Sequence, residues 1–103
     1  MDVINQNIGG KDYKFRYNMK AFARWQRAEG LTLADLGDMS KIDLMHMANL
    51  FRFASEEGGQ PLTLDEVFSL MEYPGALSEM SDAMQSKMMQ FLGDEGDEKK
   101  TTP

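Results

Sequence analysis

Few side chains in this sequence could carry out acid–base, nucleophilic or redox chemistry. The 103 residues contain one histidine and no cysteine, which excludes disulfides and cysteine-based nucleophiles or metal sites. His46 lies among apolar neighbours without an evident orienting partner, so we expect an ordinary hydrogen-bonded or surface histidine. The acidic pairs fall at predicted helix ends, where capping accounts for them, and neither Gly-Gly pair has the spacing of a nucleotide-binding loop. The sequence predicts a protein with no enzymatic activity, cofactor or metal.

Methionine is the residue type that stands out, at 10 of 103 positions. Its flexible, polarisable side chain adapts to varied apolar partners. The predicted helix over residues 76–92 carries an apolar arc made of Leu77, Met80, Met84, Met88, Phe91 and Leu92, with Met89 beside it. We favour a core position for the first three of these residues. For the C-terminal end of the arc, from Met88 onward, core and partner-binding surface are equally favoured.

A second candidate for partner binding lies on the predicted helix over residues 19–29. Lys20, Arg24 and Arg27 form a basic stripe, which we interpret as a solvated face, with an electrostatic docking strip as the alternative. Trp25 lies at the margin of the apolar face. We expect it to be part of the core, with a half-buried binding anchor as the alternative.

The elements that must position these residues begin with a β-hairpin over residues 3–8 and 11–17. The Gly9-Gly10 pair suits its tight turn, and Tyr13, Phe15 and Tyr17 alternate with basic residues as in a half-buried strand. The aromatic face must rest on helices, while the outer edge is open for pairing with another chain.

Two helical segments should follow the hairpin. The first, over residues 19–29, has Asn18 as N-cap and ends at Gly30. Its apolar face is predicted to hold Met19, Phe22 and Ala23, with Trp25 at the margin. A short turn beginning at Thr32 then brings Leu31, Leu33 and Leu36 over one end of the core.

The central helix is predicted over Ser40–Glu56, with Ser40 as N-cap and Gly58-Gly59 as its end. One broad face holds Leu44, Met47, Ala48, Leu50, Phe51 and Ala54, and the opposite side holds Ile42, Met45 and Phe53. A helix apolar on so much of its circumference must be surrounded by other elements.

The last part of the chain has the clearest local signature. Thr63 and Glu66 form a capping box, and Leu62 and Val67 form a hydrophobic staple, for a helix that runs to about residue 72. The chain is then redirected by Pro74-Gly75 into the helix over residues 76–92. We expect one domain over residues 1–92, mainly α, with four to five helices and the N-terminal hairpin (α+β), and a disordered charged tail over residues 93–103.

The net charge of −6 is unevenly distributed. Residues 1–30 hold six basic and three acidic side chains, a balance of +3, and the rest hold five and fourteen, a balance of −9. An acidic chain disfavours nucleic-acid binding, and the unevenness permits head-to-tail contact between copies. No apolar run is long enough for a membrane helix, and the N-terminus lacks signal-peptide character. We expect a soluble cytosolic protein.

The order of these pieces resembles the tail assembly chaperones of long-tailed phages and related prophage elements. The stretches IGGKDYKFRYNMKAFARWQRAEGLTLADL and LTLDEVFSLM and the closing helix carry the resemblance, which covers about residues 3–92. One departure is Gln26, where the family pattern has an acidic residue.

The resemblance implies a non-catalytic protein that acts in the host cytoplasm during virion morphogenesis and is absent from the mature virion. It would bind the tape measure protein and the tail tube protein. The uneven charge and the open hairpin edge permit self-association, and the composition predicts neither nucleic acid nor a membrane as a partner. A longer form made by ribosomal frameshift near Lys99-Lys100 is also implied. The alternative is a small phage-encoded regulatory adaptor or inhibitor that binds one folded protein stoichiometrically. A DNA-binding regulator ranks third.

Overall fold

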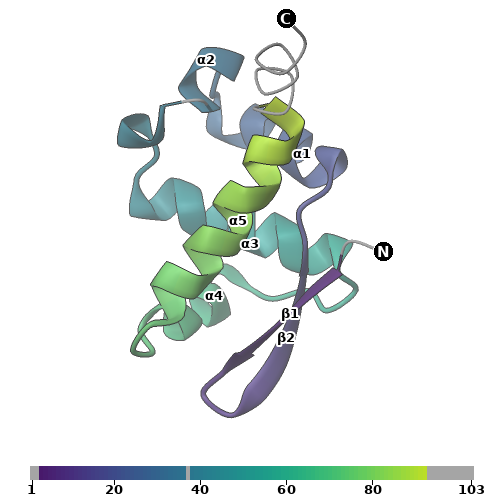
Figure 1. The fold of residues 1–103 in the computed structure, drawn as a ribbon, viewed down its shortest axis with the longest axis vertical. Helices are drawn as coiled ribbons and strands as arrows, with labels where there is room; N and C mark the ends of the chain where they lie inside the picture. The colour runs from purple at the N-terminus through teal and green to yellow at the C-terminus, as the bar shows by residue number, and fades with distance from the viewer. Residues whose placement is uncertain (1–2, 37, 93–103) are drawn as a thin grey trace, which may run out of the picture.

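The computed structural model describes residues 3–36 and 38–92, apart from the side chains of Leu33, Leu36, Met39 and Leu92. A two-stranded hairpin is followed by the helices (Figure 1). The elements are β1 (Val3–Ile8), β2 (Lys11–Arg16), α1 (Met19–Glu29), α2 (Leu33–Leu36), the 3-10 turn η1 (Met39–Lys41), α3 (Leu44–Glu57), α4 (Leu64–Met71) and α5 (Ala76–Leu92). The predicted fold class is therefore confirmed, whereas the predicted tail over residues 93–103 lies outside the described residues.

The hairpin forms where the sequence predicted it, with β2 one residue shorter. Gly9 and Gly10 have φ angles of 63° and 85°, as a two-residue turn of this kind requires. A side chain at Gly9 would also meet the ring of Tyr73, 2.6 Å from the Cβ position. Phe15 and Tyr17 are fully buried, so the aromatic face rests on the helices.

The first helix has the predicted caps but presents a different face. Asn18 accepts a hydrogen bond from the Ala21 N–H, and Gly30 ends the helix in the left-handed conformation. The predicted apolar face is wrong at two positions, because Met19 is 60% exposed and Ala23 is exposed. The helix is rotated so that Ala21, Phe22 and Trp25 are buried. Burial of the indole, the largest apolar side chain, outweighs burial of a methionine and an alanine.

The central position of α3 is confirmed. It packs against α1, β2 and α4, and in Figure 1 α5 passes in front of it. Its buried side chains include Leu50, Phe51 and Phe53. Two residues predicted within its apolar faces are exposed, since Leu44 and Met45 are 55% and 49% accessible. Both lie in the first turn of the helix.

The predicted start of α3 is wrong. Ser40 is not the N-cap, because its hydroxyl donates to the Asp38 carboxylate at 2.6 Å and closes the preceding turn. Asp43 caps the helix and accepts from the His46 N–H at 2.8 Å. The Nδ1 atom of His46 accepts from the Asp43 N–H at 3.2 Å, which completes a capping box. Two capping residues competed for this helix, and the one nearer the apolar run prevailed.

Substitution of Ser40 and of Asp43, one at a time, should show which residue caps the central helix. Asp43→Ala is expected to lower the free energy of unfolding by about 1 kcal/mol, since it removes the N-cap of the central helix. Ser40→Ala should change it by less than about 0.5 kcal/mol. Urea unfolding followed by circular dichroism measures both, and equal losses would contradict the assignment of Asp43 as the cap.

The C-terminal helices begin and end close to their predicted positions. Thr63 and Glu66 form the predicted capping box, with bonds of 3.1 and 2.8 Å, and α4 ends at Met71. Residues of β1, β2, α1, α3, α4 and α5 share one buried core, in which α5 packs against α4 and β1. Leu31 packs on this core, but the predicted sealing role of Leu33 and Leu36 lies outside the described side chains. In residues 3–36 and 38–92, no helix is both long and apolar enough to cross a bilayer.

Tyr17 is a polar residue enclosed in the core. Its ring is stacked with Phe15 and tilted against Phe22, each at 6.3 Å between centroids, and its hydroxyl has no hydrogen-bond partner among the described residues. Burial raises the pKa of Tyr17 far above its usual value of 10. The folded state therefore holds the phenol neutral, while the unfolded chain releases the proton as the pH rises through about 10.

Tyr17→Phe should consequently be neutral or stabilising by up to about 2 kcal/mol at pH 7, because an unpaired buried hydroxyl carries a desolvation cost. Above pH 10 the native protein should lose about 1.4 kcal/mol of stability per pH unit through this tyrosine. The phenylalanine variant should lack that component. Urea unfolding from pH 7 to 11 tests it, with Tyr73→Phe as the control because Tyr73 is 48% exposed. A clear loss of stability at pH 7 would show that the hydroxyl has a partner.

Candidate functional site

His46, the one histidine of the chain, is engaged in structural contacts. His46 Nδ1 accepts the Asp43 N–H, so in neutral His46 the proton is on Nε2, which lies 3.6 Å from the Glu29 carboxylate. His46 thus links the end of α1 to the start of α3. In the described part of the chain, no group of three or more histidine or acidic side chains is arranged to hold a metal ion.

The methionines of α5 divide into buried and exposed residues. Met80 and Met84 are fully buried, and Met88 is 5% exposed. These three lie in the core, the arrangement that the sequence favoured for the first two. Met89 is 60% exposed, and the side chain of Leu92 lies outside the described residues. Among the described side chains at the C-terminal end of the predicted arc, Met89 and part of Phe91 are accessible.

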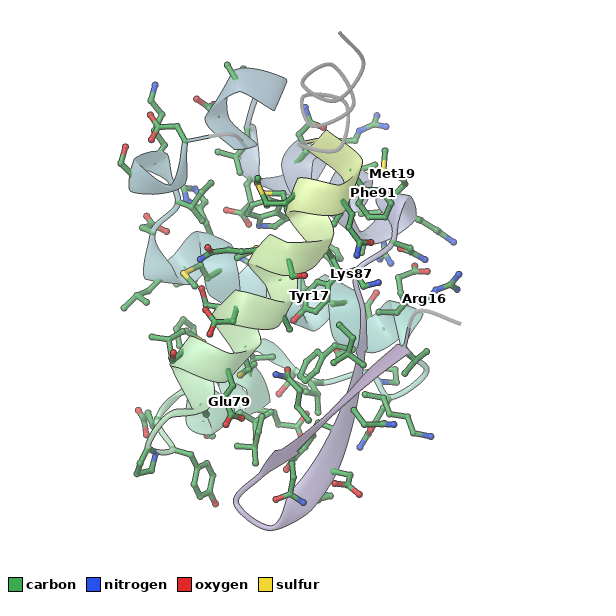
Figure 2. All side chains as sticks on the ribbon, viewed as in Figure 1. Arg16, Tyr17, Met19, Glu79, Lys87 and Phe91 are labelled. Atoms are coloured by element: carbon green, nitrogen blue, oxygen red, sulfur yellow. The ribbon has the colours of Figure 1, made fainter. Side chains whose placement is uncertain are left out.

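Phe91 lies at the border between core and surface. It is half-buried and packs edge-to-face on Phe22 of α1, with 5.8 Å between ring centroids. Met19, one turn before Phe22 on α1, is 60% exposed, and in the view of Figure 2 it projects near Phe91. We call these two residues the Met19–Phe91 patch. Met89 is on the other flank of α5, since it precedes Phe91 by two helical positions.

The basic stripe on α1 is largely occupied by contacts with α3. Arg24 Nη2 lies 2.8 Å from the Glu56 carboxylate, and Nη1 lies 3.4 Å from Glu57. Lys20 is 3.9 Å from Glu57, while Arg27 is exposed. The stripe is therefore mainly an ionic link between two helices, and its exposed members are Lys20 and Arg27.

The same link encloses Phe53. The Arg24 and Arg52 guanidinium groups lie 4.8 and 4.5 Å from the centroid of its ring, and the Glu56 carboxylate contacts both arginines. Cation–π contacts of this kind stabilise partly desolvated arginines. This cluster was not predicted from the sequence, because its residues come from two helices whose mutual packing the helical periodicity does not show.

Trp25 has the core position that the sequence favoured. It is fully buried, and its Nε1–H donates to the carbonyl oxygen of His46 at 2.7 Å. The indole is thus enclosed by α1 and α3 and offers no surface to a partner.

A hollow at the hairpin end was not predicted. It has a volume of about 390 Å³ and lies between β2, the segment 60–62 and α4. Its lining includes Tyr13, Leu62 and the half-exposed Tyr73, with Lys11 and Glu66 at its polar side. The sequence signal for this hollow is Tyr73-Pro74, an aromatic residue followed by proline just after the end of α4.

The described arrangement leaves apolar side chains exposed on α1 and α5, Met19 and Met89 among them. No family model matches this chain, and neither a curated protein nor a solved structure matches it.

Proposed function

We propose that this protein is a tail assembly chaperone of the kind found in long-tailed phages. In the host cytoplasm it binds the tape measure protein, the tail tube protein or both, by non-catalytic contacts. The pattern of residues over 3–92 supports this proposal through its resemblance to that family. The negative charge of −6 keeps a protein with exposed apolar residues soluble.

The observation that carries the proposal is the Met19–Phe91 patch. A 60% exposed methionine beside a half-buried phenylalanine offers pliable apolar surface at the junction of α1 and α5. A helical segment of the tape measure protein could place one apolar residue against each side chain. The contact tolerates varied sequences, because methionine adapts its shape to its partner.

Co-expression with the tape measure protein tests the proposal. The native protein should bring the tape measure protein into the soluble fraction. Many copies of it should co-purify with each tape measure chain. Met19→Glu should reduce the soluble tape measure protein about tenfold, because a carboxylate in an apolar contact is strongly disfavoured. Met45→Glu is the matched control, since Met45 is a 49% exposed methionine on α3.

Three results would count against the proposal. An insoluble tape measure protein in the presence of the native chain, with no tail tube protein bound, would end it. Equal losses in the two glutamate variants would remove the role of the patch. Binding of one copy to one folded partner would favour the regulatory adaptor instead.

A further inference from the structure

The outer edge of β1 carries backbone groups that the described residues leave unpaired. The two-residue turn makes Ile8 and Lys11 a hydrogen-bonded pair, and the register then alternates along the hairpin. The backbone N–H and C=O groups of Ile4, Gln6 and Ile8 therefore bond to β2. The N–H and C=O groups of Val3, Asn5 and Asn7 point away from β2. No hydrogen bond from residues 3–36 or 38–92 reaches these groups.

The outer edge of β2, in contrast, is covered at its outward-facing residue Lys14. The Lys14 N–H donates to the Gln60 side-chain oxygen at 3.1 Å. The backbone at Gly58 approaches so closely that a Cβ atom there would lie 2.7 Å from the Lys14 carbonyl oxygen. The segment that follows α3 therefore runs along this edge, and the hairpin has one free edge.

The free edge has none of the usual protection against strand pairing. Exposed edges in native proteins commonly carry lysine, proline or a bulge, whereas β1 reads VINQNI and pairs residue for residue with β2. Val3, Asn5 and Asn7 are exposed. Where α5 begins beside the Ile8 end of β1, a hollow of about 120 Å³ lined by Asn7 and Glu79 adjoins the strand.

We propose that β1 pairs antiparallel with β1 of a second copy, with the two-fold axis at Asn5. In this register Asn5 faces Asn5 of the second copy, and Val3 faces Asn7 at both ends. All three outward residues are then paired, which gives up to about six backbone hydrogen bonds. The result is a four-stranded sheet, β2-β1-β1-β2. Because the edge of β2 is covered, the pairing closes at a dimer and cannot extend into a fibre.

Charge also favours a second copy as the occupant. The three residues that meet at the junction are neutral, so no like charges are placed opposite each other. On the solvent-facing side of the four-stranded sheet, facing side chains form rows that cross the strands. Each of the two outer rows begins at Arg16 of one copy and ends at Asp12 of the other. The Lys14 side chains end the middle row, about 14 Å apart, where salt screens their repulsion.

Cysteine cross-linking tests the register in the full chain, which has no cysteine of its own. Asn5→Cys should form a disulfide-linked dimer under mild oxidation, because facing residues of a ladder lie within disulfide range. Val3→Cys and Asn7→Cys should not link when tested singly, since each is about 13 Å from its own counterpart. An equimolar mixture of these two variants should link. Ser86→Cys, exposed on α5, is the control for random collision.

Sedimentation equilibrium tests the dimer itself. The native chain should show twice the mass of one chain. Asn5→Pro should raise the dissociation constant about 5- to 150-fold, because it removes two of the shared hydrogen bonds. Its far-UV circular dichroism should be unchanged, since the Asn5 N–H is not part of the β1–β2 ladder.

The proposal would be overturned by a native monomer up to about 1 mM, by single-variant linking at Val3 or Asn7 as fast as at Asn5, or by an Asn5→Pro dimer of native affinity. A monomer that pairs only with strands of other proteins also overturns it. The inference does not rest on the proposed function, since every measurement uses this chain alone.

Discussion

Replacement of Trp25 by alanine is expected to lower the free energy of unfolding by about 3–5 kcal/mol. The indole is fully buried in the shared core, so its removal leaves a cavity between α1 and α3. It also leaves the His46 carbonyl oxygen without its 2.7 Å hydrogen bond. Small domains have only about 5–15 kcal/mol of stability, so the variant should be largely unfolded at moderate urea concentrations.

Trp25→Phe separates the two contributions. The phenyl ring fills most of the cavity but cannot donate, so the loss should be about 1–3 kcal/mol. Urea unfolding monitored by circular dichroism measures both variants, because removal of the only tryptophan precludes tryptophan fluorescence. A loss below about 1 kcal/mol for Trp25→Ala, with a native spectrum, would return Trp25 to the alternative role of a binding anchor.

Elements defined by local signals were predictable from the sequence. The Gly9-Gly10 turn fixed the hairpin, and Asn18 and Gly30 fixed both ends of α1. The capping box at Thr63 fixed the start of α4. Each signal acts within a few residues, through backbone groups that must find partners at a turn or helix end.

Choices between competing local signals were not predictable. Ser40 and Asp43 can each cap a helix, and the outcome depended on Asp38, which engages the Ser40 hydroxyl. The rotation of α1 depended on where α3 offers space for Trp25. Both outcomes are set by tertiary packing, which overrides local preference.

The candidate surface was predictable only in its chemistry. The high methionine content indicated adaptable apolar surface. Helical periodicity places Met88 and Met80 on one face, but it does not show whether a partner or the same chain covers that face. The sequence likewise did not show that the basic stripe is occupied, since its acidic partners Glu56 and Glu57 lie on another helix. Distances between elements, absent from a sequence, decided both cases.

Burial also decides which substitutions can test partner binding. Serine in place of Met88, Phe91 and Leu92 together would have been the direct test if the whole arc were exposed. Because Met88 is 5% exposed, serine there would weaken the core and confuse instability with lost binding. Exposed positions on the same helix avoid this ambiguity.

The pair Met84 and Met89 offers a matched comparison on α5. Met84 is fully buried and Met89 is 60% exposed. Met84→Ala should lower the free energy of unfolding by about 2–5 kcal/mol. Met89→Ala should change it by less than about 0.5 kcal/mol, since alanine is the better helix former and no core contact is lost. Urea unfolding of the two variants under identical conditions measures the difference.

The same pair distinguishes the two roles of methionine in this protein. If Met89 binds a partner, Met89→Ala should weaken capture of the tape measure protein while native stability is kept. Met84→Ala at low temperature, where enough of it remains folded, should capture as well as the native chain per folded molecule. Equal destabilisation of the two variants would contradict the division of α5 into a core face and an exposed flank. A destabilising effect of Met89→Ala alone would mean that the exposed flank, and not the Ala76–Met80–Met84 face, packs against the domain.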